Sequence, residues 1–514
     1  MSKTIIIIGA GLAGLSAALQ AAENGCNVKL VSSFPSERAQ SVMAEGGINA
    51  ALNTKDENDS PEEHFTDTIK AACGLADPNA VWGMTQAAPE LVHWLLKLGV
   101  QFNMSGYDDV DLRNFGGQKK KRTAFAQSDT GKQIMTAMID AVRRKEASGM
   151  VERFSHHSFL TLRLCDNICC GCVIRDEYSQ KTVELPGDAV IVATGGMHGL
   201  FGNTTGSLSN TGEVTAELFR LGVPLANGEM IQYHPTTVKC GGKRMLISEA
   251  ARGEGGRLFA MKDGKQWYFM EEKYPELGNL MPRDITAREI WKVSHESEVF
   301  LDMTEISDEI ISNKLSGLAD DCMTYLHKDI RKEPVSVLPG IHYFMGGILV
   351  DEQHRTPIQN LYAAGECCAQ YHGANRLGGN SLLGALYGGR VAAKSACEQA
   401  DVVDLSCATQ IDFPPASQIS EIKQLNKVMQ ETMGVVRNEN TLLNGIQTVQ
   451  ALTGNLPLLG MAVLKSALAR KESRGAHWRE DYPKSNDDDY LKTTVARFDG
   501  KQIQISFVPV PERR

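Results

Sequence analysis

Hydrophobic and polar positions follow two different periods within the first part of the chain. An unbroken apolar run at residues 5–8 is typical of a buried strand, here predicted over residues 4–8, and residues 12–24 repeat apolar positions at helical spacing. A second strand-like run covers residues 27–31. The order of strand, helix and strand predicts a βαβ unit, so we expect a parallel sheet to begin at the N-terminus.

The same patterns continue to about residue 226. Helical periodicity dominates residues 61–150, and short apolar runs at residues 158–164, 171–175 and 189–193 predict further strands. The α/β rhythm breaks between about residues 226 and 338, where polar loops and aromatic residues interrupt it. This break indicates an inserted second domain.

Strands return at residues 346–350 and 361–364, and the last hundred residues are helical and then polar, with Asp487–Asp489 in an expected exposed loop. We therefore predict an α/β protein with three parts. They are a Rossmann-like domain of residues 1–226 and 340–400, an inserted α+β capping domain of residues 227–339, and a C-terminal helical region and tail of residues 401–514.

Composition narrows the function classes. The 514 residues contain 53 Lys and Arg against 62 Asp and Glu, which argues against nucleic acid as the main partner. No apolar stretch approaches the roughly 20 residues of a membrane span, and the N-terminus lacks the pattern of a signal peptide.

Twelve cysteines are too dilute for a disulfide framework, so we expect a cytoplasmic location. We interpret the basic run at residues 119–122 as part of a solvated surface. The alternative is that it docks an acidic partner.

Three cysteines lie close together at Cys169, Cys170 and Cys172. They lack the second pair that zinc or iron–sulfur sites need, and buried thiols in a strand are the simpler interpretation. The chain also has no haem attachment motif. We expect no bound metal and no electron-carrying centre of this kind.

A glycine motif links the first predicted strand to the first helix. Gly9 permits the tight turn, Gly11 lets the backbone approach a pyrophosphate, and Gly14 lets the helix pack on the strand. An acidic residue that would bind a ribose is missing after the second strand, where Ser32 stands. That absence disfavours a plain NAD site.

Further glycine-rich segments favour a flavin dinucleotide. Residues 41–47 present small side chains to a flat ring, while residues 193–196 and 361–366 each end a strand. Each segment alone could be an ordinary turn, but together they predict one cofactor site. Its expected contacts are Gly9, Gly11, Ala13, Gly14, Ser32, Ala44, Gly46, Gly47, Thr194, Gly195, Glu366, Ser381 and Leu382.

Candidate reactive side chains occur in five short segments, at residues 234–236, 248–252, 283–284, 342–343 and 375–376. Their arginines and histidines suit a small dianionic substrate, because a guanidinium binds a carboxylate through two parallel hydrogen bonds. Each residue could equally be structural, and Glu249 with Arg252 has the spacing of a simple helical salt bridge. The pattern leaves open whether these residues converge.

Two long motifs, residues 372–382 and 248–256, resemble the flavoprotein subunit of the fumarate reductase/succinate dehydrogenase family, which also contains L-aspartate oxidase. The resemblance runs from residue 5 to about residue 390 and resumes at residues 473–481. It implies FAD as the cofactor and a C4 dicarboxylate, fumarate or succinate, as the substrate.

The resemblance also implies roles for single residues. Arg376, His342, His234 and Ser248 would hold the two carboxylates, and Phe115 would pack against the substrate. Flavin N5 would deliver hydride to one alkene carbon, and Arg283 would protonate the other. Glu249 and Arg252 would relay the proton to Arg283. Arginine is an unusual acid, because its pKa keeps it charged, and the residues alone suggest a clamp at Arg283.

Family members differ at two places. The segment around Phe115 is similar to fumarate reductases and lacks an obvious acidic residue for the ammonium of aspartate, although residues 283–288 lean toward L-aspartate oxidase, which stays the alternative. Gln40 stands where membrane-complex members carry the flavin-linking His. We therefore predict non-covalent FAD and prefer fumarate reduction.

The electrons must come from elsewhere. We expect a partner such as an iron–sulfur subunit or a small reduced carrier, through which the protein could associate with a membrane. A different class of function, an electron-relay or docking subunit that uses residues 119–122 as its contact, remains a further alternative.

Overall fold

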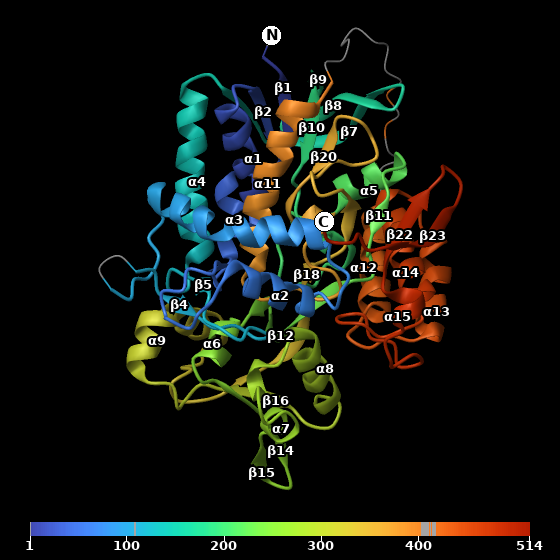
Figure 1. Cartoon of the computed structure of the whole chain (residues 1–514). Coiled ribbons are helices and arrows are strands. Elements are labelled where there is room, and N and C mark those ends of the chain that lie inside the picture. Colours follow the sequence, from blue (N-terminus) through green and yellow to red (C-terminus); the bar gives the residue numbers. More distant parts are fainter. Residues whose placement is uncertain (1, 107–108, 402–410, 412, 414–417) are drawn as a thin grey trace.

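The N-terminal apolar run forms β1 (Thr4–Ile8), the central strand of a parallel sheet. The computed structural model describes residues 2–106, 109–401, 411, 413 and 418–514 (Figure 1). The sheet has the order β20–β10–β1–β2–β6, and all its pairs are parallel. Its other strands are β2 (Asn27–Ser32), β6 (Val151–Ser155), β10 (Ala189–Val192) and β20 (Leu361–Ala363). The predicted Rossmann-like α/β architecture is confirmed.

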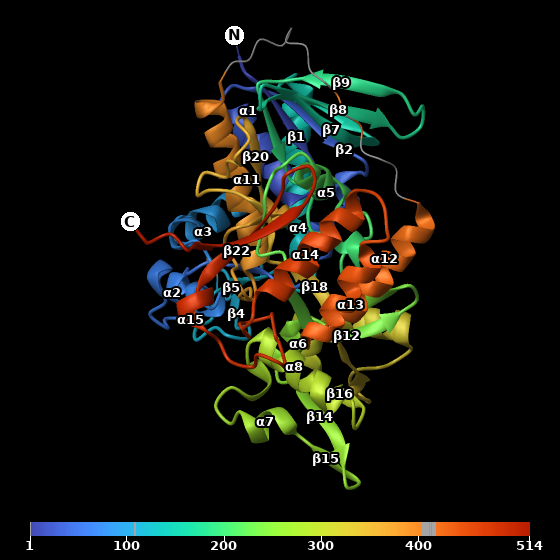
Figure 2. The ribbon, with the colours of Figure 1, turned by 90° about the vertical axis from the view of Figure 1, so that its right-hand side faces the viewer.

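Both faces of this sheet are covered, which explains why β1 is apolar at every position from Ile5 onward. Ile5 and Ile7 pack in a cluster with the helices on one face, and Ile6 and Ile8 pack against a second sheet on the other (Figure 2). The helices are α1 (Leu12–Glu23), α3 (Pro78–Lys97), α4 (Thr130–Ala147) and α11 (Asn380–Gln399). The second sheet contains β7 (His157–Cys165), β8 (Ile168–Asp176) and β9 (Thr182–Pro186).

The cysteine cluster belongs to that packing. Cys169, Cys170 and Cys172 lie on β8 and are fully buried, and Cys169 and Cys172 join the apolar core beneath the parallel sheet. Within the described ranges, no group of three or more His, Cys, Asp or Glu side chains is placed to hold a metal ion.

Two long antiparallel strands lead from the parallel sheet into the lower part of Figure 1. They are β12 (Ile231–Cys240) and β18 (Leu338–Phe344), with β13 (Lys243–Leu246) beside β12. The capping region below has its own core and a sheet of β14 (Arg257–Lys262), β15 (Lys265–Trp267), β16 (Val299–Asp302) and β17 (Val335–Ser336). Its helices include α6 (Glu249–Gly253), α7 (Phe269–Lys273), α8 (Arg283–Val293), α9 (Asp308–Lys314) and α10 (Ser316–Asp321).

The C-terminal region begins as predicted with helices, α12 (Ile419–Thr432), α13 (Glu439–Val449) and α14 (Asn455–Ala469). The polar tail contains a short helix and two strands that the sequence pattern did not predict. Asp487–Asp489, predicted in an exposed loop, starts the short helix α15 (Asp487–Tyr490), where the Asn486 side chain caps the Asp489 amide. The chain then forms a hairpin of β22 (Lys492–Phe498) and β23 (Ile503–Pro509).

That hairpin joins a sheet whose other strands come from the middle of the chain, because β22 pairs with β11 (Leu225–Ala226). Smaller elements complete the fold: α2 (Pro61–Ala71), α5 (Glu213–Arg220), β3 (Ile48–Asn49), β4 (Leu112–Arg113), β5 (Thr123–Ala124), β19 (Gly347–Leu349) and β21 (Cys368–Ala369).

We propose to retain the predicted domain bounds, residues 1–226 with 340–400, 227–339, and 401–514, of which residues 1, 107–108, 402–410, 412 and 414–417 lie outside the described ones. Separate apolar clusters in the parallel-sheet region and in the capping region support this division. Over the part of the chain that the structure describes, no helix combines the length and the apolar character needed to span a lipid bilayer.

Candidate functional site

A large cavity of about 1400 Å³ lies between the carboxyl edge of the parallel sheet and the capping region. All but two of the residues predicted to bind cofactor or substrate line it, although they come from segments far apart in the sequence. The exceptions are Gly14 and Arg252, which lie behind the lining. The predicted nucleotide and reacting sites are therefore two halves of one space.

The nucleotide half is built from backbone. Gly9 has φ of +110°, and a Cβ there would collide with the Ala193 carbonyl, while a Cβ on Gly14 would collide with the Gly9 carbonyl. Glycine is thus required where α1 leaves β1 and packs back on the sheet. Gly14 acts through this packing, which explains why it does not reach the cavity.

Two helix N-termini at this cavity lack side-chain caps. Gly11 precedes α1 and Gly379 precedes α11, and neither can cap its helix with a side chain. The Leu12 amide of α1 donates to the Ser41 hydroxyl, and the other first-turn amides at these two ends suit an anionic or strongly polar ligand. The Ser32 hydroxyl, which also lines the cavity, is buried without a hydrogen-bond partner in the described structure. These open donors and the glycine cradle fit a dinucleotide such as FAD.

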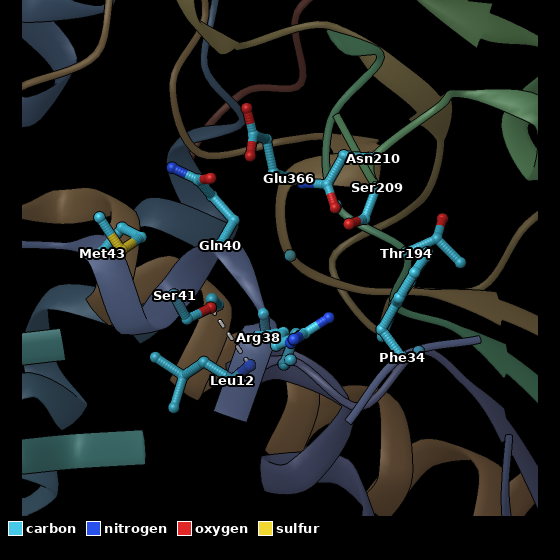
Figure 3. Close-up of a pocket in the computed structure, with 18 of the residues that line it drawn as sticks. Leu12, Phe34, Arg38, Gln40, Ser41, Met43, Thr194, Ser209, Asn210 and Glu366 are labelled. Atoms are coloured by element: carbon cyan, nitrogen blue, oxygen red, sulfur yellow. Dashed lines mark hydrogen bonds between the residues drawn. The ribbon is translucent and has the colours of Figure 1, made fainter. Parts of the chain in front are cut away.

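Figure 3 shows how side chains surround this half of the cavity. Gln40, Ser41 and Met43 lie on one side and Ser209 and Asn210 on the other, and the Ser41 hydroxyl accepts a hydrogen bond of 3.3 Å from the Leu12 amide. Sequence reasoning missed several lining residues, among them Phe34, Arg38, His157, Phe159 and Asn210. They lie in loops, in the short 3₁₀ helix Ser36–Arg38 and on β7, which reach the cavity only through the tertiary fold.

The other half of the cavity, which holds the predicted reacting residues and is called the substrate half, contains a series of paired charged side chains. Arg283, at the start of α8, donates from Nε and Nη2 to Glu249 Oε2 at 2.8 and 2.6 Å. Glu249 Oε1 accepts from the Gly116 amide at 3.1 Å and lies 3.4 Å from Arg252 Nη2. Burial works to raise the pKa of Glu249, but the charges of Arg283 and Arg252 outweigh it and lower that pKa. Glu249 is therefore an ionised carboxylate between two arginines.

Two histidines face each other beside these arginines. The rings of His234 on β12 and His342 on β18 have centroids 5.1 Å apart. His342 Nδ1 pairs with the Thr205 hydroxyl at 2.8 Å, and His234 Nδ1 lies 3.0 Å from the Thr236 carbonyl. Burial and then the charge of Arg283 lower both histidine pKa values well below 6.5, so both rings are neutral at pH 7.

Arg376 completes this half. It is 3% exposed, and among the described residues its guanidinium has no hydrogen-bond acceptor or carboxylate partner. It rests on the Tyr343 ring, 4.3 Å from the ring centroid. Burial and the charge of Arg283 lower its pKa to about 9, so it remains cationic at pH 7. A buried, unpaired cation of this kind calls for an anionic ligand.

Ser248 and Phe115 also line the cavity. The Ser248 hydroxyl accepts weakly from the Ala250 amide at 3.4 Å as the N-cap of α6. Phe115 is buried, and a Cβ on Gly46 would meet its ring at 2.9 Å, so it separates the glycine segment from the capping region. Both positions are close enough to contact a small ligand.

Sequence reasoning missed two supporting residues, Thr205 and Gln232. Gln232 is fully buried and accepts from Arg283 Nη1 at 3.1 Å. Its position two residues before His234 in one extended strand is the signal that could have identified it. Thr205 lies in a loop, and nothing in the sequence pattern distinguishes it.

The basic run offers less surface than its sequence suggests. Arg122 is fully buried in ion pairs with Asp59 and Asp67. Lys120 donates to the Asn58 carbonyl, and the Lys121 amide bonds Glu57. The run is thus partly internal, and part of its charge is already compensated.

Known proteins are similar to this chain over almost its whole length. The FAD binding domain family model matches residues 4–382, and the fumarate reductase flavoprotein C-terminal model matches residues 452–513. The chain is 38% identical to the succinate dehydrogenase flavoprotein subunit of Bacillus subtilis, covering 100% of this chain and 98% of that protein. It is 33% identical to the L-aspartate oxidase of Pyrococcus furiosus, covering 94% and 97%. The quinol fumarate reductase flavoprotein of E. coli has a similar structure, with a TM-score of 0.89 at 27% identity over 99% of this chain and 97% of that one.

Proposed function

Because the chain belongs to the fumarate reductase/succinate dehydrogenase flavoprotein family, we propose that this FAD-dependent oxidoreductase works as a fumarate reductase. It would reduce fumarate to succinate with electrons from a separate donor. The observation that carries the proposal is the buried, unpaired guanidinium of Arg376, which faces the same cavity as two neutral histidines. A dicarboxylate supplies the negative charge that this arrangement lacks.

Binding of the substrate follows from this arrangement. Arg376 binds one carboxylate through its fork, and the imidazoles of His234 and His342, with the Ser248 hydroxyl, complete the contacts to both carboxylates. Phe115 covers the apolar centre of the molecule. These side chains are largely buried, so the charged contacts are stronger than they would be in solvent.

Reduction of the alkene needs a hydride and a proton. FAD, when bound, would be the source of the hydride for one alkene carbon, and Arg283 would donate the proton to the other. Glu249 contacts both Arg283 and Arg252, so it can return a proton to Arg283 from Arg252. Arg252 Nη1 in turn donates to the Asn279 carbonyl at 2.6 Å, which fixes the far end of the relay.

We propose that the FAD is held without a covalent bond, because the carboxamide of Gln40 cannot form the imidazole–flavin link. Acid precipitation of the purified protein tests this directly. The flavin should remain in the supernatant, and a yellow pellet would contradict the proposal. The Gln40→His variant is the matched comparison, because it places a histidine where membrane-complex members carry the flavin-linking one.

L-aspartate oxidation is a second candidate, favoured by the similarity to the Pyrococcus furiosus enzyme. Anaerobic mixing separates the two. Reduced protein should be reoxidised by fumarate, and oxidised protein should keep its flavin absorbance in the presence of L-aspartate. Bleaching by L-aspartate would favour the oxidase instead.

The physiological electron donor is proposed as an iron–sulfur subunit or a small reduced carrier. Turnover of the isolated chain with reduced viologen and fumarate would support an enzyme with its own complete site. No turnover under these conditions would favour the electron-relay or docking role.

A further inference from the structure

Two polar residues next to the proposed reactive arginines have no part in binding or proton transfer as described so far. Asp284 follows Arg283 at the start of α8, in the capping region. Asn375 precedes Arg376 in the loop before α11, in the parallel-sheet region. Sequence reasoning placed both in candidate segments without giving either a role. The structure brings them together, with a hydrogen bond of 3.1 Å from Asn375 Nδ2 to Asp284 Oδ1.

This bond closes a ring. Arg283 Nη1 donates to Gln232 Oε1 at 3.1 Å, and Gln232 Nε2 donates to Asn375 Oδ1 at 2.9 Å. Asn375 then donates to Asp284, which is joined to Arg283 by the chain itself. Gln232 Nε2 also donates to the Arg376 carbonyl at 2.9 Å, so the ring includes the backbone of the second arginine.

The hydrogen bonds of this ring can run from donor to acceptor in only one order. A guanidinium only donates, whereas a carboxylate and a backbone carbonyl only accept, so both amide groups have one permitted orientation. Gln232 is fully buried and Asn375 is 3% exposed, and inverting either amide would leave buried groups unpaired. The geometry of the ring is therefore set by chemistry at every position.

The ring also connects two regions of the fold. Arg283 and Asp284 belong to the capping region, and Asn375 and Arg376 belong to the parallel-sheet region, with Gln232 on the connecting strand β12. In a reduction of fumarate, the proton donor and the carboxylate clamp must lie at a fixed separation, because the alkene carbon is fixed relative to the carboxylates.

We propose that Gln232, Asn375 and Asp284 are positioning residues that hold Arg283 in register with Arg376. This inference rests on the proposed function for its catalytic consequence. The three residues act through the two arginines and need not touch the substrate. Breaking the bond between Asn375 and Asp284 frees Asp284 at the start of α8 from the parallel-sheet region while leaving Arg376 bonded to Gln232, so turnover should suffer more than substrate binding.

An exchange of the two side chains tests this. Asn375→Asp places two carboxylates against each other and should lower kcat for fumarate reduction, per bound FAD, at least tenfold, with KM changed less than threefold. Asp284→Asn keeps an acceptor for Asn375 and should lower kcat less than threefold. The double variant D284N/N375D restores the bond in the opposite direction, because the new amide at position 284 would donate to the new carboxylate at position 375. It should recover kcat to within threefold of D284N.

Amide hydrogen exchange of the FAD-loaded protein provides a readout that does not depend on catalysis. The Thr286 amide, which donates to the Pro282 carbonyl at the start of α8, should exchange at least fivefold faster in N375D than in the unaltered protein, and the double variant should reverse this. The proposal is overturned if N375D exchanges normally there, or if the double variant recovers neither exchange nor kcat. Failure of the unaltered protein to reduce fumarate would instead refute the proposed function, and the exchange measurement would still decide on the ring.

Discussion

The two halves of the cavity are built in different ways. The nucleotide half begins with one continuous stretch, β1, the glycine turn and α1, whose backbone forms the cradle. The substrate half takes single side chains from β12, α6, α8, β18 and the loop before α11. Local chain geometry fixes the first half, whereas hydrogen bonds between distant segments fix the second.

This difference has a consequence for substitution. In the nucleotide half a side chain can often change as long as the backbone keeps its path, so glycines are the sensitive positions. In the substrate half the backbone path is less important than the donors and acceptors that meet across it.

Arg283→Lys should have the largest effect. A lysine ammonium cannot keep both the paired bonds to Glu249 and the bond to Gln232, and loss of a positioned general acid costs about 10²–10⁴ in rate. We expect kcat for fumarate reduction to fall about 10³-fold, with KM changed less, measured with reduced viologen. Arg244→Lys is the control, since Arg244 lines the same cavity but bonds Thr237 instead. A loss in both variants alike would argue against a special role for Arg283.

Gly9→Ala should be the most damaging change in the nucleotide half. The new Cβ would require the backbone at φ +110° and would meet the Ala193 carbonyl, so FAD affinity should fall by at least about 100-fold. Gly25→Ala is a matched control, because Gly25 also has positive φ, +79°, but open space around its Cβ. It should cost about 1 kcal/mol of stability and retain FAD. Flavin content after gel filtration distinguishes the two, and equal loss would refute the cradle argument.

The contrast between the halves also explains what the sequence could predict. The helix expected at residues 12–24 is α1 (Leu12–Glu23), and the strand expected at residues 27–31 is β2 (Asn27–Ser32), because periodicity and glycine spacing act locally. The convergence of Arg283, His342 and Arg376 could not be derived from periodicity. That prediction came from the resemblance to a family. The fold supplies the physical reason why these three residues meet in one cavity.

Contacts formed only by tertiary pairing were missed or misjudged. Gln232 and Thr205 look like ordinary strand and loop residues, and their roles depend on what lies opposite them. The tail was expected to be polar, with no strand assigned to it, yet β22 (Lys492–Phe498) pairs with β11 (Leu225–Ala226). No local pattern announces a partner that lies more than two hundred residues away along the chain.

Dicarboxylate binding should strengthen as pH falls. His234 and His342 are neutral at pH 7, because burial and the charge of Arg283 hold their pKa values below 6.5. A bound dianion favours the protonated rings and raises these pKa values, so binding takes up protons. The dissociation constant for succinate should therefore fall as pH is lowered from 7 toward the low pKa values of the free rings, by at most about tenfold per pH unit for each proton taken up.

Flavin difference spectra at each pH measure this effect. His342→Asn should flatten the dependence, and His93→Asn should leave it unchanged, since His93 is exposed and pairs locally with the Pro89 carbonyl. Affinity that does not change with pH, or that weakens as pH falls, would show that the histidines do not sense the ligand.

The smallest effect concerns the C-terminal segment at residues 473–481. The Arg288 guanidinium on α8 lies 4.0 Å from the centre of the Trp478 ring, and the Ala476 amide donates to the Ala374 carbonyl, next to the Asn375–Arg376 pair. The segment thus supports both sides of the substrate half. A cation–π contact of about 0.5–1 kcal/mol corresponds to roughly two- to fivefold in rate, so Trp478→Leu should lower kcat by that factor.

Trp478→Phe keeps an aromatic face and should lose less than Trp478→Leu. Trp291→Phe is the control on the same helix, because the Trp291 ring packs edge-on against His295, just beyond the end of α8. If the leucine variant keeps full kcat, or if phenylalanine loses as much as leucine, the substrate half does not depend on this segment. The capping and parallel-sheet regions alone would then hold the substrate half. Fewer distant segments would fix it than the contacts indicate, so it would differ less from the nucleotide half.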